Sequence, residues 1–321
     1  MTGGAGYVGS QTCKLLFENG FIPITFDNLS TGHQENVKWG PLEIGDLRNK
    51  KDIERLFDKY KFKSVFHFAA KAYVGESVAD PLAYFSNNIA GSINLIEEFL
   101  QRGGENFVFS SSCATYGEST ADFISENQEQ NPINPYGFTK LAVEKLLIAL
   151  SNNTKFKFAI LRYFNAAGAD VSCELGEWHD PETHVIPLLV EAFRNKQPFT
   201  IFGSDFETLD GTAIRDYIHV IDLADAHLAA LRNIIDNSRN LIVNVGTGVG
   251  TSIQELVDMV GELDPDFQVS VEGRRQGDPA RLVADICLIE HELKWKPKHS
   301  SSRNILETAI KWHDMKNSRK K

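Results

Sequence analysis

The chain of 321 residues has few cysteines, and none of them form the patterns of a disulfide framework or a zinc site. Cys13, Cys113, Cys173 and Cys287 are scattered, and no two of them make a C-x-x-C motif. This spacing favours reduced thiols over paired or metal-bound ones. The sequence therefore predicts a cytoplasmic protein without a metal centre.

Long apolar runs and an excess of positive charge are also absent. No run of about 18 apolar residues is present, so no transmembrane helix is predicted. The N-terminus is rich in glycine instead of basic and then apolar, which argues against a signal peptide. The formal net charge of −10 argues against a general nucleic-acid binder. We expect neither a membrane nor a nucleic acid as partner, although local arginines could hold an anionic ligand.

Predicted strands and helices alternate through the first half of the chain. The strands are "FIPITF", "SVFHFA", "NFVFSS" and "FKFAILRY", and the helices cover about 10–20, 50–60, 81–102 and 136–151. Nearly continuous apolar strands separated by helices indicate a parallel sheet covered on both faces. The predicted fold class is α/β, with a Rossmann-type doubly wound sheet.

The pattern loosens after about Asn165, where short elements lie among loops. This predicts a smaller C-terminal α/β domain over 166–211 and 247–321, and a first domain over 1–165. The strand and helix character of 212–246 suggests that this segment returns to the first domain.

A glycine-rich loop opens the chain. Gly4–Gly9 matches G-x-G-x-x-G, and Gly3 extends the pattern. Such glycines allow a tight turn and close approach of a pyrophosphate, which the next helix meets with its free N–H groups. Asp27 follows the next predicted strand, where a carboxylate accepts from ribose hydroxyls and repels a 2′-phosphate, favouring NAD over NADP. Alone the pattern could be a simple turn, but this context predicts nucleotide binding.

The sequence lacks the strand that normally precedes such a loop, because only Met1 and Thr2 stand before Gly3. An apolar segment of about five residues is expected there. One explanation is a start placed too late or a trimmed chain, and the other is a genuine truncation with a weakened cofactor site. The intact downstream elements favour the first.

Tyr136 and Lys140 stand four residues apart in "PYGFTKLAVEKLL", which places them on one face of a helix. A nearby ammonium lowers the pKa of a tyrosine, which could then remove a proton from a sugar hydroxyl. "FVFSSSCATYG" places hydroxyls beside the same site. The alternative is an amphipathic helix with a packed tyrosine and a solvated lysine, together with a serine turn at a strand end.

These residues carry a resemblance that covers essentially the whole chain. "TGGAGYVGS", "HFAA", "SSSCATYG", "PYGFTK", "LRYFNAAGA", "DGTAIRDYIHVIDLADAH" and "GRRQGDPARLVAD" occur in this order. Together they resemble the extended short-chain dehydrogenase/reductase family, and within it the NAD-dependent epimerases and dehydratases of nucleotide sugars. The resemblance implies interconversion of UDP-glucose and UDP-galactose at C4 through a 4-keto intermediate, with hydride passing to and from bound NAD.

The resemblance also implies roles for individual residues. Tyr136 would take the proton, Lys140 would lower its pKa, and Ser112 would bond the 4′-oxygen of the sugar. Contacts with NAD would come from Gly3, Gly6, Tyr7, Val8, Gly9, Asp27, Asn28, Asp46, Leu47, Phe68, Ala69, Asn87, Tyr136, Lys140 and Phe164. Contacts with the UDP-sugar would come from Ser112, Tyr136, Asn165, Phe202, Arg215, Arg275 and Asp278.

Some positions depart from the family pattern. Lys71 lies one place before the lysine of some members, and His184 stands where some have asparagine, so neither receives a role beyond a helix N-terminal position for His184. Cys113-Ala114 replaces the acid pair of dehydratases, which argues against dehydration.

Other readings remain open. They are a 4-epimerase of UDP-xylose/arabinose or UDP-GlcNAc, and a non-catalytic NAD-binding protein. By resemblance, the helices at about 81–102 and 136–151 would pair with their copies in a homodimer.

Overall fold

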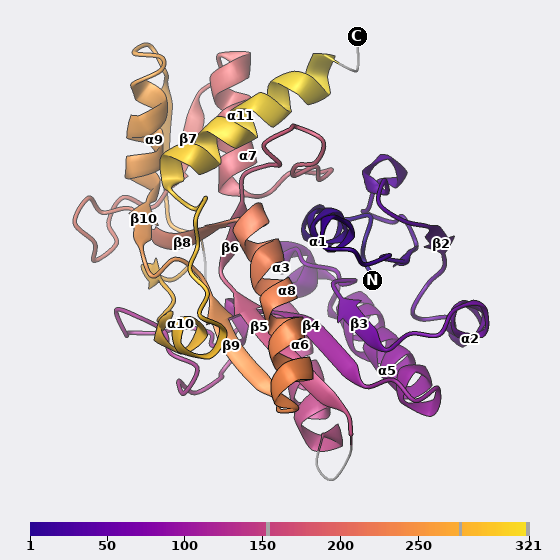
Figure 1. The fold of residues 1–321 in the computed structure, drawn as a ribbon. Helices are drawn as coiled ribbons and strands as arrows, with labels where there is room; N and C mark the ends of the chain where they lie inside the picture. The colour runs from indigo at the N-terminus through magenta and orange to yellow at the C-terminus, as the bar shows by residue number, and fades with distance from the viewer. Residues whose placement is uncertain (152–154, 276–277, 319–321) are drawn as a thin grey trace.

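The computed structural model describes residues 1–151, 155–275 and 278–318. Its main sheet consists of parallel strands, which run from β2 through β1 on one side and then through β3, β4, β5 and β9 (Figure 1). These strands are β1 (Thr25–Asp27), β2 (Leu42–Ile44), β3 (Ser64–His67), β4 (Asn106–Ser112), β5 (Lys157–Tyr163) and β9 (Leu241–Val245). All their ladders are parallel, so the carboxyl ends of the strands meet at one edge of the sheet.

Thr2 occupies the place of the missing first strand. It forms one parallel bridge to Phe26 of β1 and another to His67 of β3. Its amide donates to the Phe66 carbonyl over 3.0 Å, and its own carbonyl accepts from the Phe68 amide over 3.0 Å. No regular strand precedes the glycine loop within the described residues, and this single bridged residue joins the two halves of the sheet.

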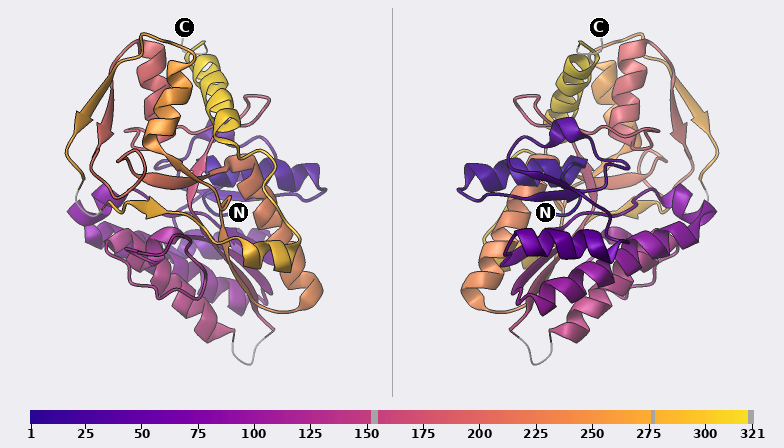
Figure 2. Two further views of the ribbon diagram at one scale, coloured as in Figure 1. Left: turned by 90° about the vertical axis from the view of Figure 1, so that its left-hand side faces the viewer. Right: turned by 90° about the vertical axis from the view of Figure 1, so that its right-hand side faces the viewer.

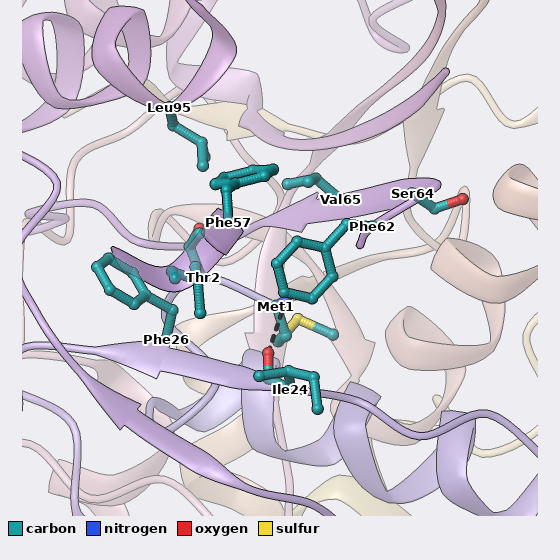
Figure 3. Close-up of a pocket in the computed structure, with 10 residues that line it drawn as sticks. Met1, Thr2, Ile24, Phe26, Phe57, Phe62, Ser64, Val65 and Leu95 are labelled. Carbon is teal, nitrogen blue, oxygen red and sulfur yellow. Dashed lines mark hydrogen bonds between the residues drawn. The ribbon is translucent and has the colours of Figure 1, made fainter. Parts of the chain in front are cut away.

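Met1 extends this connection by one residue. Its terminal ammonium donates to the Ile24 carbonyl over 2.9 Å (Figure 3). Beside it lies a cavity of about 10 Å³, with room for one water at most. Apolar side chains from β1, β3 and two helices therefore fill most of the space next to the chain start; the cavity is lined by Met1, Thr2, Ile24, Phe26, Leu56, Phe57, Phe62, Ser64, Val65 and Leu95.

Helices cover both faces of the sheet. On one face lie α1 (Tyr7–Glu18), α8 (Val220–Asn237) and α10 (Cys287–Leu293), around a core that includes Leu16, Leu161 and Leu231. On the other lie α2 (Lys50–Lys59), α5 (Gly91–Gln101) and α6 (Pro135–Leu150), around a core that includes Phe99 and Leu147. Apart from β2 at the edge of the sheet, the strands are largely buried on both sides, which explains their continuous apolar sequences. The predicted doubly wound α/β fold is confirmed.

The predicted helix at about 81–102 is composed of several segments. After α3 (Val74–Ala79), α4 (Pro81–Tyr84) begins behind Asp80, whose carboxylate accepts from the Ala83 amide over 3.2 Å. The chain then passes through the π-helical segment η2 (Phe85–Ala90) into α5. Two short 3₁₀ helices, η1 (Gln34–Asn36) and η3 (Cys113–Thr115), complete this half of the chain.

A second layer of structure stands beyond the carboxyl edge of the sheet (Figure 2). It contains α7 (Val185–Asn195), α9 (Ile253–Gly261) and α11 (Ser302–Ser318), with the parallel pair β7 (Phe199–Phe202) and β11 (Val269–Glu272). Between the layers, β8 (Ile214–His219) pairs with β6 (Asn165–Ala167), β10 (Gly250–Ser252) and β12 (Arg281–Leu282).

The second layer has its own apolar core, which includes Leu189, Leu256 and Ile305. Ile289 of α10, however, belongs to the core of the main sheet. The domain boundaries given above stay a prediction. Among the described residues, no helix is both long and apolar enough to cross a membrane.

Candidate active site

The glycine loop forms a cradle that side chains would fill. Gly3 has a φ of +69°, and a Cβ on it would lie 2.5 Å from the backbone nitrogen of Ala69. A Cβ on Gly9 would collide with the Gly3 carbonyl oxygen. By contrast, a Cβ on Gly6 would meet only the Gly3 oxygen, at 3.4 Å, so the loop is open above Gly6. Gly6 also precedes α1 without a side-chain cap, leaving the first N–H groups of the helix for a phosphate.

Asp27 lies at the end of β1 and is buried beside this loop. Its carboxylate accepts from the Ala5 amide over 3.0 Å and from the Leu29 amide over 2.9 Å, which fixes its orientation. Burial raises its pKa, although these amides oppose the shift. A buried carboxylate at this position suits the ribose hydroxyls of a dinucleotide and disfavours a further phosphate. The cradle and Asp27 thus fit NAD.

Asn28 and Asp46 lie next to each other beyond Asp27. The Asn28 amide donates to Asp46 over 3.0 Å, and Arg48 pairs with the same carboxylate over 2.6 Å. Hydrogen bonds from Arg48 hold the pKa of Asp46 well below its usual range. Asp46 does not cap α2, because Asn49 is the N-cap and accepts from the Lys51 amide over 3.2 Å.

The remaining predicted cofactor residues come from several elements and differ in their contacts. The Tyr7 hydroxyl donates to the Gly168 carbonyl over 2.5 Å, and the Phe68 ring lies 4.7 Å from the His227 ring. Asn87 donates to Asn88 over 2.9 Å. Val8 packs against the core shared by α1 and α8, Leu47 and Ala69 belong to the core on the opposite face, and Phe164 lies in a small buried cluster with Tyr116.

Tyr136 and Lys140 come from the first turns of α6. Asn134 caps this helix by accepting from the Gly137 amide over 2.8 Å, and Pro135 takes the first helical position. Both side chains are buried, and the Lys140 ammonium lies 5.8 Å from the centre of the Tyr136 ring. Lys140 also donates to the Ser110 carbonyl over 2.6 Å, which holds it against the end of β4. The alternative of a solvated lysine is wrong.

The charges at this pair differ from the prediction. Burial raises the pKa of Tyr136, and a hydrogen bond from Ser112 opposes the shift only in part. Burial also lowers the pKa of Lys140 to about 7, against a weaker opposite effect of Glu144. In the protein by itself, burial therefore has the largest effect on the pKa of Tyr136, and the lowering expected from Lys140 stays a prediction.

Three successive serines end β4 and have different partners. Ser110 bonds the Tyr163 hydroxyl over 2.7 Å, and Ser111 donates to Glu144 over 2.5 Å. Ser112 accepts from the Ala114 amide over 3.1 Å and lies against Tyr136. Because Ser110 and Ser111 are bonded to Tyr163 and Glu144, Ser112 is the serine whose hydroxyl lies beside the phenol. The side chain that the resemblance selected is the one beside Tyr136.

A buried ion pair that sequence reasoning missed supports this site from behind. Arg162 of β5 and Glu144 of α6 are almost fully buried and lie 2.7 Å apart. Glu144 also accepts from Ser111, and Arg162 donates to the Tyr116 hydroxyl over 2.9 Å. Such a satisfied network fixes the face of α6 against the sheet.

The predicted substrate residues meet in two pairs on the other side of Tyr136. The Arg275 guanidinium stacks 3.8 Å from the centre of the Phe202 ring. Arg215 of β8 forms an ion pair with Asp278. Arg215 also lies close enough to Cys113 to oppose, in part, the burial that raises the pKa of this thiol to about 12. The Arg215–Asp278 pair is thereby connected to the end of β4, where Ser112 lies.

Asn165 and Asp216 hold this side of the site in place. The Asn165 amide donates to the Asp216 carbonyl over 3.1 Å. The Asp216 carboxylate, which sequence reasoning also missed, is buried and accepts from Thr247, Gly248 and Ala284. It ties β8 to the loop that follows β9.

Lys71 and His184 were singled out by the sequence without a catalytic role. Lys71 pairs with Glu76 over 2.7 Å. His67 on β3 is buried, and burial lowers its pKa to about 3, so it is a neutral strand residue. His184 is the N-cap residue of α7, which confirms its helix N-terminal position.

This fold, with a dinucleotide cradle and a buried Tyr-Lys pair at the sheet edge, defines a class of enzymes. The model of the NAD dependent epimerase/dehydratase family matches residues 1–246. The chain belongs to this family.

The relatives narrow the class. The chain is 44% identical to a UDP-glucose 4-epimerase of Rhizobium meliloti over 319 residues, covering 99% of this chain and 97% of that protein. It resembles the UDP-glucose 4-epimerase of Brucella ovis in complex with NAD, with a TM-score of 0.92, 46% identity, and 97% and 96% of the two chains covered. The enzyme of Stenotrophomonas maltophila with NAD and formylated UDP-arabinopyranose gives a TM-score of 0.95 at 34% identity, covering 99% and 98%.

Proposed function

We propose that this chain interconverts UDP-glucose and UDP-galactose by inverting C4 of the sugar, with NAD as its bound cofactor. The observation that carries the proposal is the burial of Tyr136 and Lys140 beside Ser112, between a dinucleotide cradle and two arginines. Full-length likeness to UDP-glucose 4-epimerases supports the same reaction.

The protein supplies the proton chemistry of this reaction. NAD, when bound, supplies the acceptor and then the donor of a hydride, and in its oxidised form it brings a positive charge. Because a positive charge favours phenolate, Tyr136 becomes able to take the proton of the 4′-hydroxyl and later return it. Ser112 holds the same sugar oxygen. Lys140, held by Ser110, would bind the cofactor ribose.

The second side of the site would hold the nucleotide. Arg215 and Arg275 pair with the diphosphate, where planar guanidinium groups match two oxygens each. Asp278 accepts from the uridine ribose, Phe202 lines the uracil site, and Asn165 contacts the substrate near its diphosphate. In this account the domain over 1–165, with 212–246, holds NAD, and the remainder of the chain holds the UDP-sugar.

The first test uses the purified chain with UDP-galactose, with and without added NAD⁺, and follows UDP-glucose. Turnover without added NAD⁺ is expected, because the cradle is complete and Thr2 bridges the sheet beneath it. No turnover in either condition would contradict the proposal. UDP-arabinose and UDP-N-acetylgalactosamine are tested as alternative substrates. A higher kcat/KM for either one than for UDP-galactose would make it the preferred substrate and contradict the assigned sugar.

We also infer a homodimer formed by the helical segments 81–101 and 135–150. Apolar side chains are exposed along them, with Leu82 and Phe138 being 81% and 50% exposed, and Phe85 and Ile93 also exposed. Light scattering should give twice the 35.9 kDa of one chain. The Phe138→Glu variant should halve this mass, whereas Ile235→Glu on α8 should not. A single-chain mass for the unmodified protein would contradict the inference.

We also propose a cytoplasmic location, which the cysteines support. All four cysteines are free thiols, as expected in a reducing compartment. Cell fractionation with an antibody to this chain should find it with cytoplasmic markers, and recovery in an oxidising compartment would contradict this.

A further inference from the structure

Four side chains between β6 and α7 converge outside the Tyr136 site. Glu177, His179, Glu182 and His184 each present one donor atom, and these atoms all lie within 4.8 Å of one another. They come from a stretch of eight residues with the spacing E-x-H-x-x-E-x-H. Glu177 is buried and His184 is exposed, so the cluster extends from the interior of the protein to its surface.

The separations within the cluster are those of ligands around one small ion. The Nδ1 atom of His179 lies 3.3 Å from Glu177 and 3.6 Å from Glu182, and the Nδ1 atom of His184 lies 3.9 Å from Glu182. Four ligands at about 2.0–2.2 Å from a tetrahedral zinc ion are about 3.3–3.6 Å from each other. His184 and Glu177 are closer, in direct contact.

One donor atom in the cluster forms ion pairs with two carboxylates but no hydrogen bond of normal geometry. The Nδ1 atom of His179 is buried without a hydrogen bond to any residue that the structure describes, although two carboxylates surround it. A buried polar atom of this kind needs an explanation, and an ion between it and the carboxylates provides one. The cluster is also supported from outside: the Trp312 indole donates to the Glu177 carbonyl over 2.9 Å, and Glu182 accepts from the amides of Thr183 and His184.

We propose that Glu177, His179, Glu182 and His184 form a binding site for a transition-metal dication, with Zn²⁺ as the best match. Two imidazoles and two carboxylates are a nitrogen and oxygen donor set that suits zinc, whereas Mg²⁺ prefers oxygen ligands alone. Two carboxylates also neutralise the double charge of the ion when both histidines are neutral ligands. The site goes beyond the sugar chemistry and uses none of the residues assigned to it.

The metal would fix a loop against the cofactor cradle. The His179 ring meets the Tyr7 ring edge-on at 6.5 Å and the Tyr73 ring at 5.6 Å. The preceding residue, Trp178, stacks on His33 at 3.8 Å. An ion that holds Glu177 to the first turn of α7 therefore stabilises the packing of this loop on the glycine loop, and zinc should raise the unfolding temperature.

The test is zinc binding by the untagged full-length chain after chelation and removal of the chelator. We expect one Zn²⁺ per chain, no comparable binding of Mg²⁺, and an affinity at least about 100-fold lower in His179→Gln/His184→Gln. The matched control, His291→Gln/His313→Gln, removes two histidines elsewhere and should bind as the unmodified chain does. Equal binding by the first variant, or tight Mg²⁺ binding, would overturn the assignment.

A second measurement does not depend on the folding of any variant. X-ray absorption of the zinc-loaded, unmodified chain should show two imidazoles and oxygen ligands at about 2.0–2.1 Å. A chain that takes up no zinc, or zinc without two imidazole ligands, would leave the cluster as an ion-pair network and refute the proposal.

Discussion

The two sides of the Tyr136 site are built in different ways. On the cofactor side the backbone defines the surface: Gly3 and Gly9 leave no room for a side chain, and amides orient Asp27. On the substrate side, side chains define the surface and contact each other. Arg215 pairs with Asp278, and Arg275 stacks on the Phe202 ring.

This difference indicates how much each side must rearrange when its ligand binds. A backbone cradle costs little to reorganise when its ligand binds, whereas Arg215 must exchange a carboxylate for a diphosphate. We therefore expect the cofactor side to tolerate almost no change of shape, and the substrate side to respond gradually to changes of charge and geometry.

The Gly3→Ala substitution should have the largest effect. It places a Cβ 2.5 Å from the Ala69 nitrogen at a φ of +69°. The left-handed backbone alone costs about 1–2 kcal/mol, and the collision adds to it. We expect a free energy of unfolding lower by about 3 kcal/mol or more and loss of bound NAD, measured by urea unfolding and by the cofactor released on denaturation.

Gly6→Ala provides the control for this prediction. Its Cβ would meet only the Gly3 oxygen at 3.4 Å, so the fold should keep nearly all its stability while NAD occupancy falls. If both variants lost the same stability, the cradle would be ordinary packing and not a ligand surface.

Lys140, which lies between the cofactor side and the substrate side, should make the free energy of unfolding depend on pH. Burial lowers its pKa from 10.5 to about 7, so between these values the unfolded chain binds more protons than the folded chain. Through Lys140, the free energy of unfolding therefore increases as the pH rises, by roughly 1.4 kcal/mol per pH unit at most. Below about pH 7 this increase is absent. Urea unfolding should show this gain relative to Lys140→Met, which cannot titrate. Parallel pH profiles would contradict a buried, titrating lysine.

On the substrate side, Arg275→Lys should have a moderate effect. Lysine keeps the charge but loses the planar group that stacks on Phe202 and pairs with two phosphate oxygens. We expect KM for the UDP-sugar to rise about 10- to 100-fold with a small change in kcat. Arg274→Lys is the neighbouring control, because Arg274 pairs with Asp205 instead. An unchanged KM would remove Arg275 from the substrate site.

Much of the sheet and the Tyr136 site could be predicted, because both are local patterns. Alternating apolar segments indicated the doubly wound layers, and the i,i+4 spacing placed Tyr136 and Lys140 together. Contacts between distant segments were not predictable in this way. Glu144 with Arg162, and Asp216 with the loop after β9, depend on β-strand neighbours that only the fold specifies.

The balance of charge was the second feature that the sequence could not provide. A lysine beside a tyrosine suggested a lowered tyrosine pKa, but burial of both groups has the larger effect and raises it. The sequence also did not show what takes the place of the first strand. In the fold, Thr2 takes it by bridging to Phe26 of β1 and His67 of β3.

The smallest effect is expected at Lys71. Its ammonium pairs with Glu76 at a partly exposed position, and such pairs contribute about 0–1 kcal/mol. Lys71→Ala should change neither NAD occupancy nor kcat/KM by more than about threefold. A loss of bound NAD would instead show that this lysine leaves Glu76 for the cofactor.

The most direct test of the central claim compares Tyr136→Phe with Tyr60→Phe in the conversion of UDP-galactose. Tyr60 bonds Glu43 over 2.6 Å at the end of α2, so its loss should leave turnover unchanged. Tyr136→Phe should retain the fold and bound NAD but lower kcat by about 10²- to 10⁴-fold, the usual contribution of a general acid–base group. Full turnover by Tyr136→Phe would contradict the account.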